Sequence, residues 1–460
     1  MLTYDLEARG GLSLYDYLTR CIKGDILAGT LRPGEKLPSK RALARHLEVS
    51  VSTVETAYAQ LEAEGYVYAQ EKRGYFVTAL EGAEPPPPAA HPSIQLPQEE
   101  PEHWLLDFKG DGAGTEGFPF TVWARLMRRV LSEEGEKLLR PLPHNGVRPL
   151  REAIAGYLRQ FRGMAVEGEQ IVVGAGAEYL YNLIVQLLGR DCVYGVETPG
   201  YPKSERVYTL NGARCVPLPL DRHGVSAECA QASGAQVLHL SPSHQFPSGV
   251  VTPIARRQSL LRWAAAEPGR FIIEDDYDSE FRFRGRPIPT LQSIDRWDRV
   301  LYLNTFNRTL APSLRIGYLV LPPALLPRYR EKLGFYSCTV PAMEQYTLAR
   351  FLSEGGFESH MNRMRVFYRA RRERLLAALD ASSLAGRCRV RGVDAGLHFL
   401  LELDTQWDDE TLAARAREAG IRLSFLSEYG GGEAHCLVVR DPVGELDHWA
   451  EALERLAGLL

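Results

Sequence analysis

The pattern of hydrophobic and polar residues near the start of the chain predicts a small helical unit that ends in a hairpin. Apolar residues recur at helical spacing between Leu14 and Ile26. The runs 40–48 and 52–64 predict two further short helices around a tight turn, and alternating residues in 66–79 predict a β-hairpin. Two helices at a sharp turn followed by a hairpin are typical of a winged helix-turn-helix.

Further along, strand-like and helix-like patterns alternate for more than 200 residues. The expected strands are IVVGA, CVYGVE, CVPLPL, VLHLSP, FIIEDD, VLYLNTF and IGYLVLP. Their near-continuous apolar character, with helical stretches between most of them, predicts a mainly parallel sheet with helices on both faces. A long helical region from Pro341 to about Asp380 and a mixed α/β tail predict a smaller lobe over about 341–460.

A proline-rich segment separates these two patterns. Residues 84–101 read EPPPPAAHPSIQLPQEEP, with seven prolines. Such a stretch favours an extended, stiff conformation, and compact domains seldom contain so long a loop without secondary structure. We therefore predict a head at 1–80, a linker at 81–103 and a large domain at 104–460.

Composition agrees with a multidomain protein of the cytoplasm. The 460 residues include 54 basic and 58 acidic side chains, so the net charge is −4, and 45% of the residues are hydrophobic. We find no apolar run long enough to span a membrane and no signal peptide. The seven cysteines are scattered and never form CxxC, which indicates reduced thiols and neither a disulfide framework nor a metal site. Net charge excludes nothing about nucleic acids, because cations can cluster locally.

The expected DNA-binding surface follows from the winged helix-turn-helix pattern. Short polar side chains at the start of the second helix of this motif reach base edges and phosphates, and cations on the neighbouring helix and the wing reach phosphates. The candidates are Ser39, Lys40, Arg41, Arg45, Ser50, Ser52, Thr53, Thr56, Lys72, Arg73 and Gly74. The alternative is a winged-helix module that binds protein.

The head resembles the DNA-binding domain of GntR-type bacterial regulators over about 65 residues, from LRPGEKLPSKRALARHLEVS onward. That resemblance implies that Arg41, the arginine of the LPS-x-R motif, touches DNA. The chain differs from the family at Val51, where an arginine is common. One expected DNA contact is therefore missing, and the operator sequence does not follow.

The large domain resembles fold-type-I aminotransferases, which use pyridoxal 5′-phosphate, and the whole chain is similar to MocR regulators. The resemblance implies an α+β head joined to an α/β aminotransferase-like domain. The pattern also fits the chemistry: a helix N-terminus suits a phosphate, and a carboxylate at a strand end suits a pyridine nitrogen. The implied cofactor or effector pocket is Gly176, Ala177, Glu178, Tyr201, His244, Gln245, Asp275, Tyr277, Thr305, Arg308 and Arg315.

The position of the cofactor lysine is occupied by arginine. Relatives that bind the cofactor covalently read TFSKT-x-APS-x-R, whereas this chain reads TFNRTLAPSLR, with Arg308 at the lysine position. An arginine stays protonated and offers no free amine, so no internal aldimine can form there. We therefore expect no catalytic residue and no transaminase activity. Pyridoxal 5′-phosphate binds without a covalent bond or not at all.

Two further departures concern charged groups of the pocket. In EAHCLVVRDP, His435 stands where the family has a carboxylate-binding arginine, and Arg440 follows five residues on. For Arg440, a ligand contact and a surface charge both remain open. Glu178 stands where many relatives have glutamine, which adds negative charge near the phosphate position.

The leading interpretation is a bacterial transcriptional regulator that binds an operator in double-stranded DNA. Its degenerate aminotransferase-like domain senses an unknown small molecule, and the resemblance implies a head-to-tail homodimer on the nucleoid, away from any membrane. One alternative is an enzyme, an aminotransferase or lyase, with noncovalent pyridoxal phosphate. Another is an effector-blind dimerisation scaffold for the head.

Overall fold

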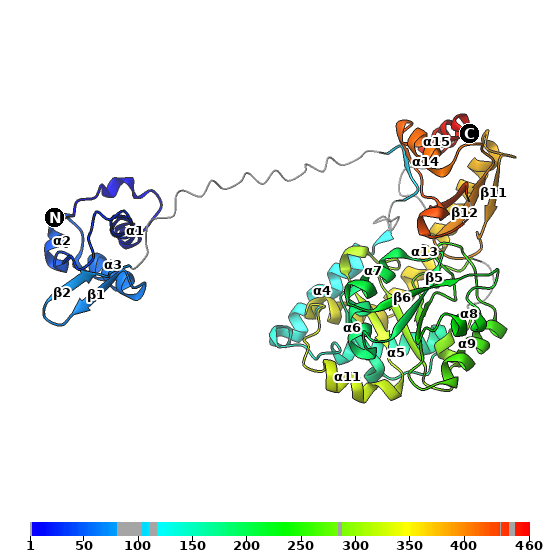
Figure 1. Cartoon of the computed structure of the whole chain (residues 1–460), viewed down its shortest axis with the longest axis horizontal. Helices are drawn as coiled ribbons and strands as arrows, with labels where there is room; N and C mark the ends of the chain where they lie inside the picture. The colour runs from blue at the N-terminus through cyan, green and yellow to red at the C-terminus, as the bar shows by residue number, and fades with distance from the viewer. Residues whose placement is uncertain (1, 81–103, 110–116, 284–287, 433, 441–446) are drawn as a thin grey trace. The chain divides into compact units, whose positions relative to one another are not determined.

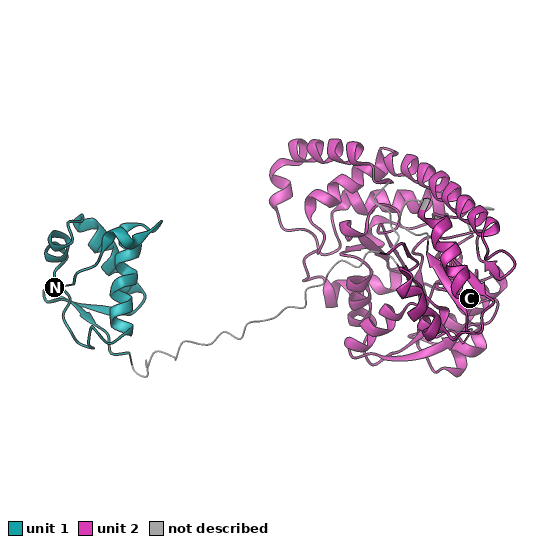
Figure 2. Ribbon diagram, turned by 90° about the horizontal axis from the view of Figure 1, so that it is seen from above, with its two compact units in different colours: residues 1–101 teal, residues 102–460 magenta. Residues whose placement is uncertain are grey.

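The computed structural model describes residues 2–80, 104–109, 117–283, 288–432, 434–440 and 447–460. The chain divides into two compact units, Met1–Pro101 and Glu102–Leu460 (Figure 2). The segment 81–103, expected as a linker, lies outside the described residues. None of the described helices is both long and apolar enough to cross a membrane.

The first unit is a winged helix-turn-helix, as the sequence predicts (Figure 1). A short 3-10 helix, Leu6–Arg9, precedes the first α-helix. The main elements are α1 (Leu14–Leu27), α2 (Lys40–His46), α3 (Val51–Ala63), β1 (Val67–Gln70) and β2 (Gly74–Val77). The side chains of Ser13, Ser39 and Ser50 cap the three helices, each accepting a hydrogen bond from a backbone N–H three residues on. Apolar faces of these helices and of the antiparallel hairpin form one core.

The second unit is built on a seven-stranded sheet with the order β4-β10-β9-β8-β7-β5-β6. Only β10 runs antiparallel to its neighbours β4 and β9, so the sheet is mainly parallel, as predicted. The strands are β4 (Ile171–Gly174), β5 (Val193–Thr198), β6 (Arg214–Pro219), β7 (Val237–Leu240), β8 (Phe271–Asp275), β9 (Val300–Thr305) and β10 (Gly317–Val320).

Helices cover both faces of this sheet. On β9, Leu301 and Leu303 pack into a core shared with α6 (Ala177–Leu188) and α11 (Leu326–Leu333). Tyr302 points into a core shared with α5 (Arg148–Arg162) and α12 (Ala342–Ser353). Both faces are therefore buried, which explains the continuous apolar runs of the strands. The helices are α4 (Phe120–Glu134), α5 (Arg148–Arg162), α6 (Ala177–Leu188), α7 (Pro202–Leu210), α8 (Ala227–Ala232), α9 (Ile254–Ala266), α10 (Leu291–Ile294), α11 (Leu326–Leu333), α12 (Ala342–Ser353) and α13 (Gly356–Ala381).

A smaller lobe contains the C-terminal elements. It comprises β11 (Cys388–Arg391), β12 (His398–Leu403), α14 (Asp409–Glu418), β13 (Ile421–Arg422), β14 (Cys436–Arg440) and α15 (Asp447–Leu459), with β3 (Leu106–Asp107) paired to β13.

The limits of this lobe differ from the predicted 341–460. Phe357 at the start of α13 packs in the large core, whereas Leu375 and Leu379 near its end pack in the small-lobe core. Leu106 and Phe108, far away in sequence, belong to that same small-lobe core.

Candidate functional site

A cavity of about 310 Å³ lies at the carboxyl ends of the parallel strands. Parallel sheets commonly bind ligands at this edge, because the loops after successive strands converge there. Nine of the residues expected from the sequence line this cavity: Ala177, Glu178, Tyr201, Asp275, Tyr277, Thr305, Arg308, Arg315 and Arg440. Gly176, another expected residue, does not line the cavity but lies next to the guanidinium of Arg315.

Asp275 is held rigidly at the end of β8. Its Oδ2 accepts a hydrogen bond from the Tyr181 hydroxyl at 2.6 Å and lies 3.2 Å from His239 Nε2. Behind it, the Tyr208 hydroxyl contacts His239 Nδ1 at 2.8 Å. Burial raises the pKa of Tyr181 far above its ordinary value, and the Asp275 charge adds to this, so the phenol stays a donor. The cavity thus contains an oriented carboxylate suited to an N–H group or a cation.

Glu197 is a third acidic group in the cavity wall, beside Asp275 and Glu178, and it was not among the residues expected from the sequence. Its Oε2 accepts hydrogen bonds from the Ser241 backbone N–H at 3.1 Å and from Gln245 Nε2 at 3.3 Å. Burial raises the pKa of Glu197 from the ordinary 4.5 to about 8, although these two hydrogen bonds oppose the shift. Near neutral pH, Glu197 is therefore mainly uncharged.

Glu197 makes the stability of the large unit depend on pH. A carboxyl pKa raised by folding favours the folded state below the unfolded pKa of 4.5, and this advantage disappears as the pH rises through about 8. Glu197→Gln, which keeps an acceptor oxygen and never ionises, should therefore become more stable relative to the parent as the pH rises above 4.5. Its advantage in unfolding free energy should grow by about 2–4 kcal/mol between pH 6 and pH 9, at roughly 1.4 kcal/mol per unit of pKa shift. Urea unfolding of the large unit at both pH values measures this. Glu205→Gln, an exposed change on α7, should show no such pH-dependent gain.

The phosphate-binding end expected at α6 contains a carboxylate of the chain itself. The Arg315 guanidinium donates to Glu178 Oε2 at 2.5 Å, and Lys203 Nζ lies 3.6 Å from Glu178 Oε1. Burial pushes the pKa of Glu178 upward, but Arg315, the helix backbone and Lys203 outweigh it and hold the pKa below its ordinary value. Glu178 is therefore ionised.

Arg308 lies in the wall of the cavity, close to Tyr277. Burial raises the pKa of Tyr277 far above its ordinary value, Asp278 adds to the shift, and the positive charge of Arg308 opposes it. Among the described lining residues the one primary amine is Lys203, and that amine pairs with Glu178. Arg308 also lines a smaller neighbouring cavity together with His398 and Arg440.

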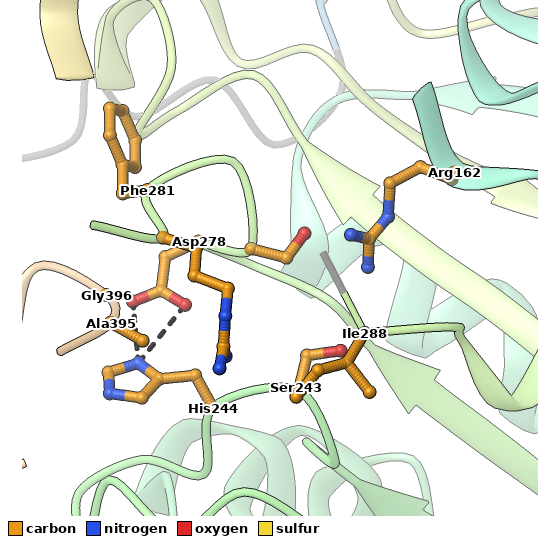
Figure 3. A pocket seen from close by; sticks show the side chains of 10 residues that line it. Arg162, Ser243, His244, Asp278, Phe281, Ile288, Ala395 and Gly396 are labelled. Atoms are coloured by element: carbon orange, nitrogen blue, oxygen red, sulfur yellow. Dashed lines mark hydrogen bonds and ion pairs between the residues drawn. The ribbon is translucent and has the colours of Figure 1, made fainter. Parts of the chain in front are cut away.

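His244 and Gln245, expected as ring contacts, do not line the large cavity. Gln245 is buried and bonds to Glu197 and to the Pro199 carbonyl oxygen at 2.9 Å. His244 Nδ1 contacts Asp278 Oδ2 at 3.0 Å beside Gly396 (Figure 3). The side chains of His244 and Gln245 therefore stabilise the loop next to the cavity and are not part of its wall.

The contacts of His244 join the large lobe to the small lobe. Asp278 Oδ2 also accepts the backbone N–H of Leu397 at 3.2 Å, and the rings of His244 and His398 lie 4.4 Å apart. Burial lowers the pKa of His398 far below its ordinary value, with His244 adding to the shift, so its ring is neutral. Two histidines and an aspartate suit a metal ion by residue type. The contacts described above already explain why His244, Asp278 and His398 lie close together.

The two candidates for a ligand carboxylate have different positions. Arg440, at the end of β14, lines the cavity and stacks on Phe246, 5.0 Å from the ring centroid. His435 lies in the small lobe next to Asp409, whose carboxylate accepts the His435 backbone N–H at 2.7 Å. Only Arg440 is in the cavity wall.

The head presents most of its candidate residues on its surface. Arg41, Arg45, Lys72 and Arg73 are exposed. The Ser50 hydroxyl, in contrast, already contacts the hydroxyls of Ser52 and Thr53, the latter at 2.7 Å.

Two further head candidates are engaged within the head. Lys40 pairs with Glu55 at 2.7 Å, and the Thr56 hydroxyl donates to the Ser52 carbonyl at 3.0 Å. Lys36, which the sequence analysis omitted, bridges to Phe76 and packs against Gly74 of the wing.

Comparisons with known proteins agree with this two-part architecture. Residues 14–77 match the family of bacterial regulatory proteins called gntR, and residues 110–430 match aminotransferase class I and II. The chain is 38% identical to the uncharacterised HTH-type transcriptional regulator YdeL of Bacillus subtilis, over 90% of this chain and 89% of that protein. It is 33% identical to the probable rhizopine catabolism regulatory protein MocR of Rhizobium meliloti, over 93% and 89%.

The chain belongs to the MocR-type regulators of the GntR family. It is thus an HTH-type transcriptional regulator with an aminotransferase-like domain. A solved structure of LysN, an α-aminoadipate aminotransferase from Thermus thermophilus, superimposes with a TM-score of 0.67 at 27% identity, covering 77% of this chain and 91% of LysN. That LysN structure is a complex with N-(5′-phosphopyridoxyl)-L-leucine.

Aminotransferases of this fold use pyridoxal 5′-phosphate, and two lining residues of this cavity do not suit that cofactor. Arg308 offers no free amine to an aldehyde, and the ionised Glu178 lies at the N-terminus of α6, where a phosphate would be favoured. Asp275 and Tyr277 line the same cavity and are residue types that suit a pyridine ring.

Proposed function

We propose that this regulator senses a small molecule through noncovalent binding in the large cavity and that it is not a transaminase. The observation that carries the proposal is the combination of a built cavity with an arginine at position 308. Asp275, held by Tyr181 and His239, orients the ligand, and Arg308 and Arg440 add positive charge. A ligand that binds one arrangement of the dimer better than another shifts the operator spacing that the heads can reach.

The proposal includes a homodimer in the bacterial cytoplasm, bound to an operator in double-stranded DNA. It is tested with the full-length protein and a fluorescent duplex from its own promoter region. Amino acids and pyridine vitamers are screened for compounds that raise the melting temperature, and each hit is then titrated into the DNA complex. A hit should change operator affinity in the parent and lose that effect in Asp275→Asn.

Two results would each favour another function. Product formation from amino acids with added pyridoxal 5′-phosphate would favour an enzyme. Hits that never change operator affinity, or a complete lack of hits, would favour a scaffold for the DNA-binding head.

Arg41→Ala should weaken operator binding by about 1–3 kcal/mol, that is roughly 5-fold to 150-fold, because a phosphate-directed cation is lost. The slope of log affinity against log salt should fall by about 1 for the same reason. Fluorescence anisotropy at several salt concentrations measures both quantities. Arg20→Ala makes the same charge change on α1 and should leave affinity and slope near the parent values. Equal losses in the two variants would contradict the assignment.

A further inference from the structure

The helix N-terminus at the phosphate end has a defined arrangement of charges. Helix α6 begins after Gly176, which has φ +88 and no side chain to cap the helix. Backbone N–H groups without a partner inside the helix, together with the helix dipole, make a helix N-terminus attractive to an anion. Glu178, in the first helical turn, lies here and meets Arg315 and Lys203.

The backbone around Arg315 and around Gly176 places the Arg315 guanidinium next to α6. It follows the 3-10 turn Pro312–Leu314 and adopts the left-handed conformation, with φ +51. A Cβ at position 176 would lie 2.5 Å from its Nη2, so only glycine leaves room for the guanidinium. Nη2 also approaches the Ala175 carbonyl oxygen at 3.5 Å. The guanidinium is therefore positioned beside the N-terminus of α6, where it meets Glu178.

The Glu178 carboxylate supplies there the negative charge that a ligand phosphate would otherwise supply. Its side chain and that of Arg315 are 34% and 44% exposed, so the pair contributes little to folding stability. The pair instead affects which ligands can bind in the cavity. A phosphate dianion entering this end must compete with Glu178 for the same two cations. Even if Glu178 turns aside, its backbone attachment keeps a like charge nearby.

We infer that Glu178 acts as a built-in anion that fills the phosphate end of the cavity, and that the effector of this regulator is a phosphate-free small molecule. This inference rests on the proposed noncovalent sensing by the same cavity. The ligand class is a compact, uncharged or cationic molecule that presents an N–H group to Asp275. Glu178 is then a specificity-determining residue that rejects phosphate esters.

The test uses two probes that differ only in the phosphate, pyridoxine and pyridoxine 5′-phosphate, neither of which has an aldehyde. Isothermal titration with the full-length protein should show that the parent prefers pyridoxine. Glu178→Gln should bind pyridoxine 5′-phosphate at least about tenfold more tightly than the parent, because one like charge is removed next to a dianion. The pyridoxine affinity should stay within about threefold, and inorganic phosphate should begin to broaden in ³¹P spectra.

Glu205→Gln provides the matched control, because it removes the same charge from an exposed position on α7 outside the cavity wall. It should leave the preference between the probes unchanged. The inference is overturned if the parent prefers pyridoxine 5′-phosphate, or if Glu178→Gln gains no affinity for it or for inorganic phosphate.

Failure of this inference can be distinguished from failure of the proposed function. If Glu178→Gln gains phosphate affinity but no ligand changes operator binding, the proposed sensing is refuted and the role of Glu178 is supported. If a ligand changes operator binding but Glu178→Gln gains no phosphate affinity, the proposed sensing is supported and the role of Glu178 is refuted.

Discussion

Gly396→Ala is expected to destabilise the large unit by about 3–5 kcal/mol, which combines the strain of a left-handed alanine with overpacking of a closed site. Gly396 is buried and has φ +68. An added Cβ would lie 1.9 Å from His244 Cε1 and 2.5 Å from Asp278 Oδ2, so one of these side chains would have to move.

Neither neighbour has room to move. The His244 ring is hydrogen-bonded to Asp278 (Figure 3), and it also lies against the His398 ring. The adjacent cavity of about 20 Å³ is large enough for one water molecule but too small for an imidazole ring. Asp278 also accepts the Leu397 N–H, so its displacement would break a contact between the two lobes.

Gly392→Ala is the matched control for the Gly396 change. Gly392 has a similar φ of +77, but it is exposed and the nearest atom to an added Cβ, in Gly249, is 4.0 Å away. This variant should therefore show only the backbone cost, about 1 kcal/mol. Calorimetry that separates the transition of the large unit from that of the head measures both. Equal losses in the two variants would contradict the crowding argument at Gly396.

The sequence predicted those parts of the fold that depend on local patterns. The run FIIEDD gave both strand β8 and the position of Asp275, because an apolar strand carries its acidic end to the sheet edge. Ser39 and Ser50 similarly marked the beginnings of α2 and α3, since serine accepts from the backbone N–H groups at a helix start.

Residues defined by long-range contacts could not be found in this way. Glu197 lies near the end of β5, but its raised pKa depends on burial at the cavity edge and on Asp275, far along the chain. From the sequence, Tyr181 is predicted to be an ordinary core residue of α6. Only the structure shows that its hydroxyl donates a hydrogen bond to Asp275. The boundary of the small lobe could not be located from the sequence for a related reason: α13 is one continuous helix whose two ends pack in different cores. Nothing in its local pattern marks that change.

The double variant Arg308→Lys, Glu178→Gln is expected to bind pyridoxal 5′-phosphate covalently, with a visible absorbance band that survives dialysis. The parent should show no such band. Unlike arginine, a lysine can lose its proton and react with an aldehyde, and a buried amine does so more readily. Asp275 and Tyr277 line the cavity, so under the proposed function the chain lacks only the amine and an open phosphate end.

The two substitutions separate the two obstacles when they are combined with two aldehydes. Arg308→Lys alone should form the stable band with pyridoxal, which has no phosphate, and only weakly with pyridoxal 5′-phosphate. Adding Glu178→Gln should restore the reaction with the phosphate ester, whereas adding Glu205→Gln should not.

A dialysis-stable band in the parent would mean that another amine reacts, and Lys203 is the lining residue to replace first. Arg308 would then not explain the loss of covalent binding. Equal reactivity of Arg308→Lys toward both aldehydes would leave the role of Arg308 intact and would refute the role of Glu178. The band thus reports on each residue separately, because one substitution supplies the nucleophile and the other removes the competing anion.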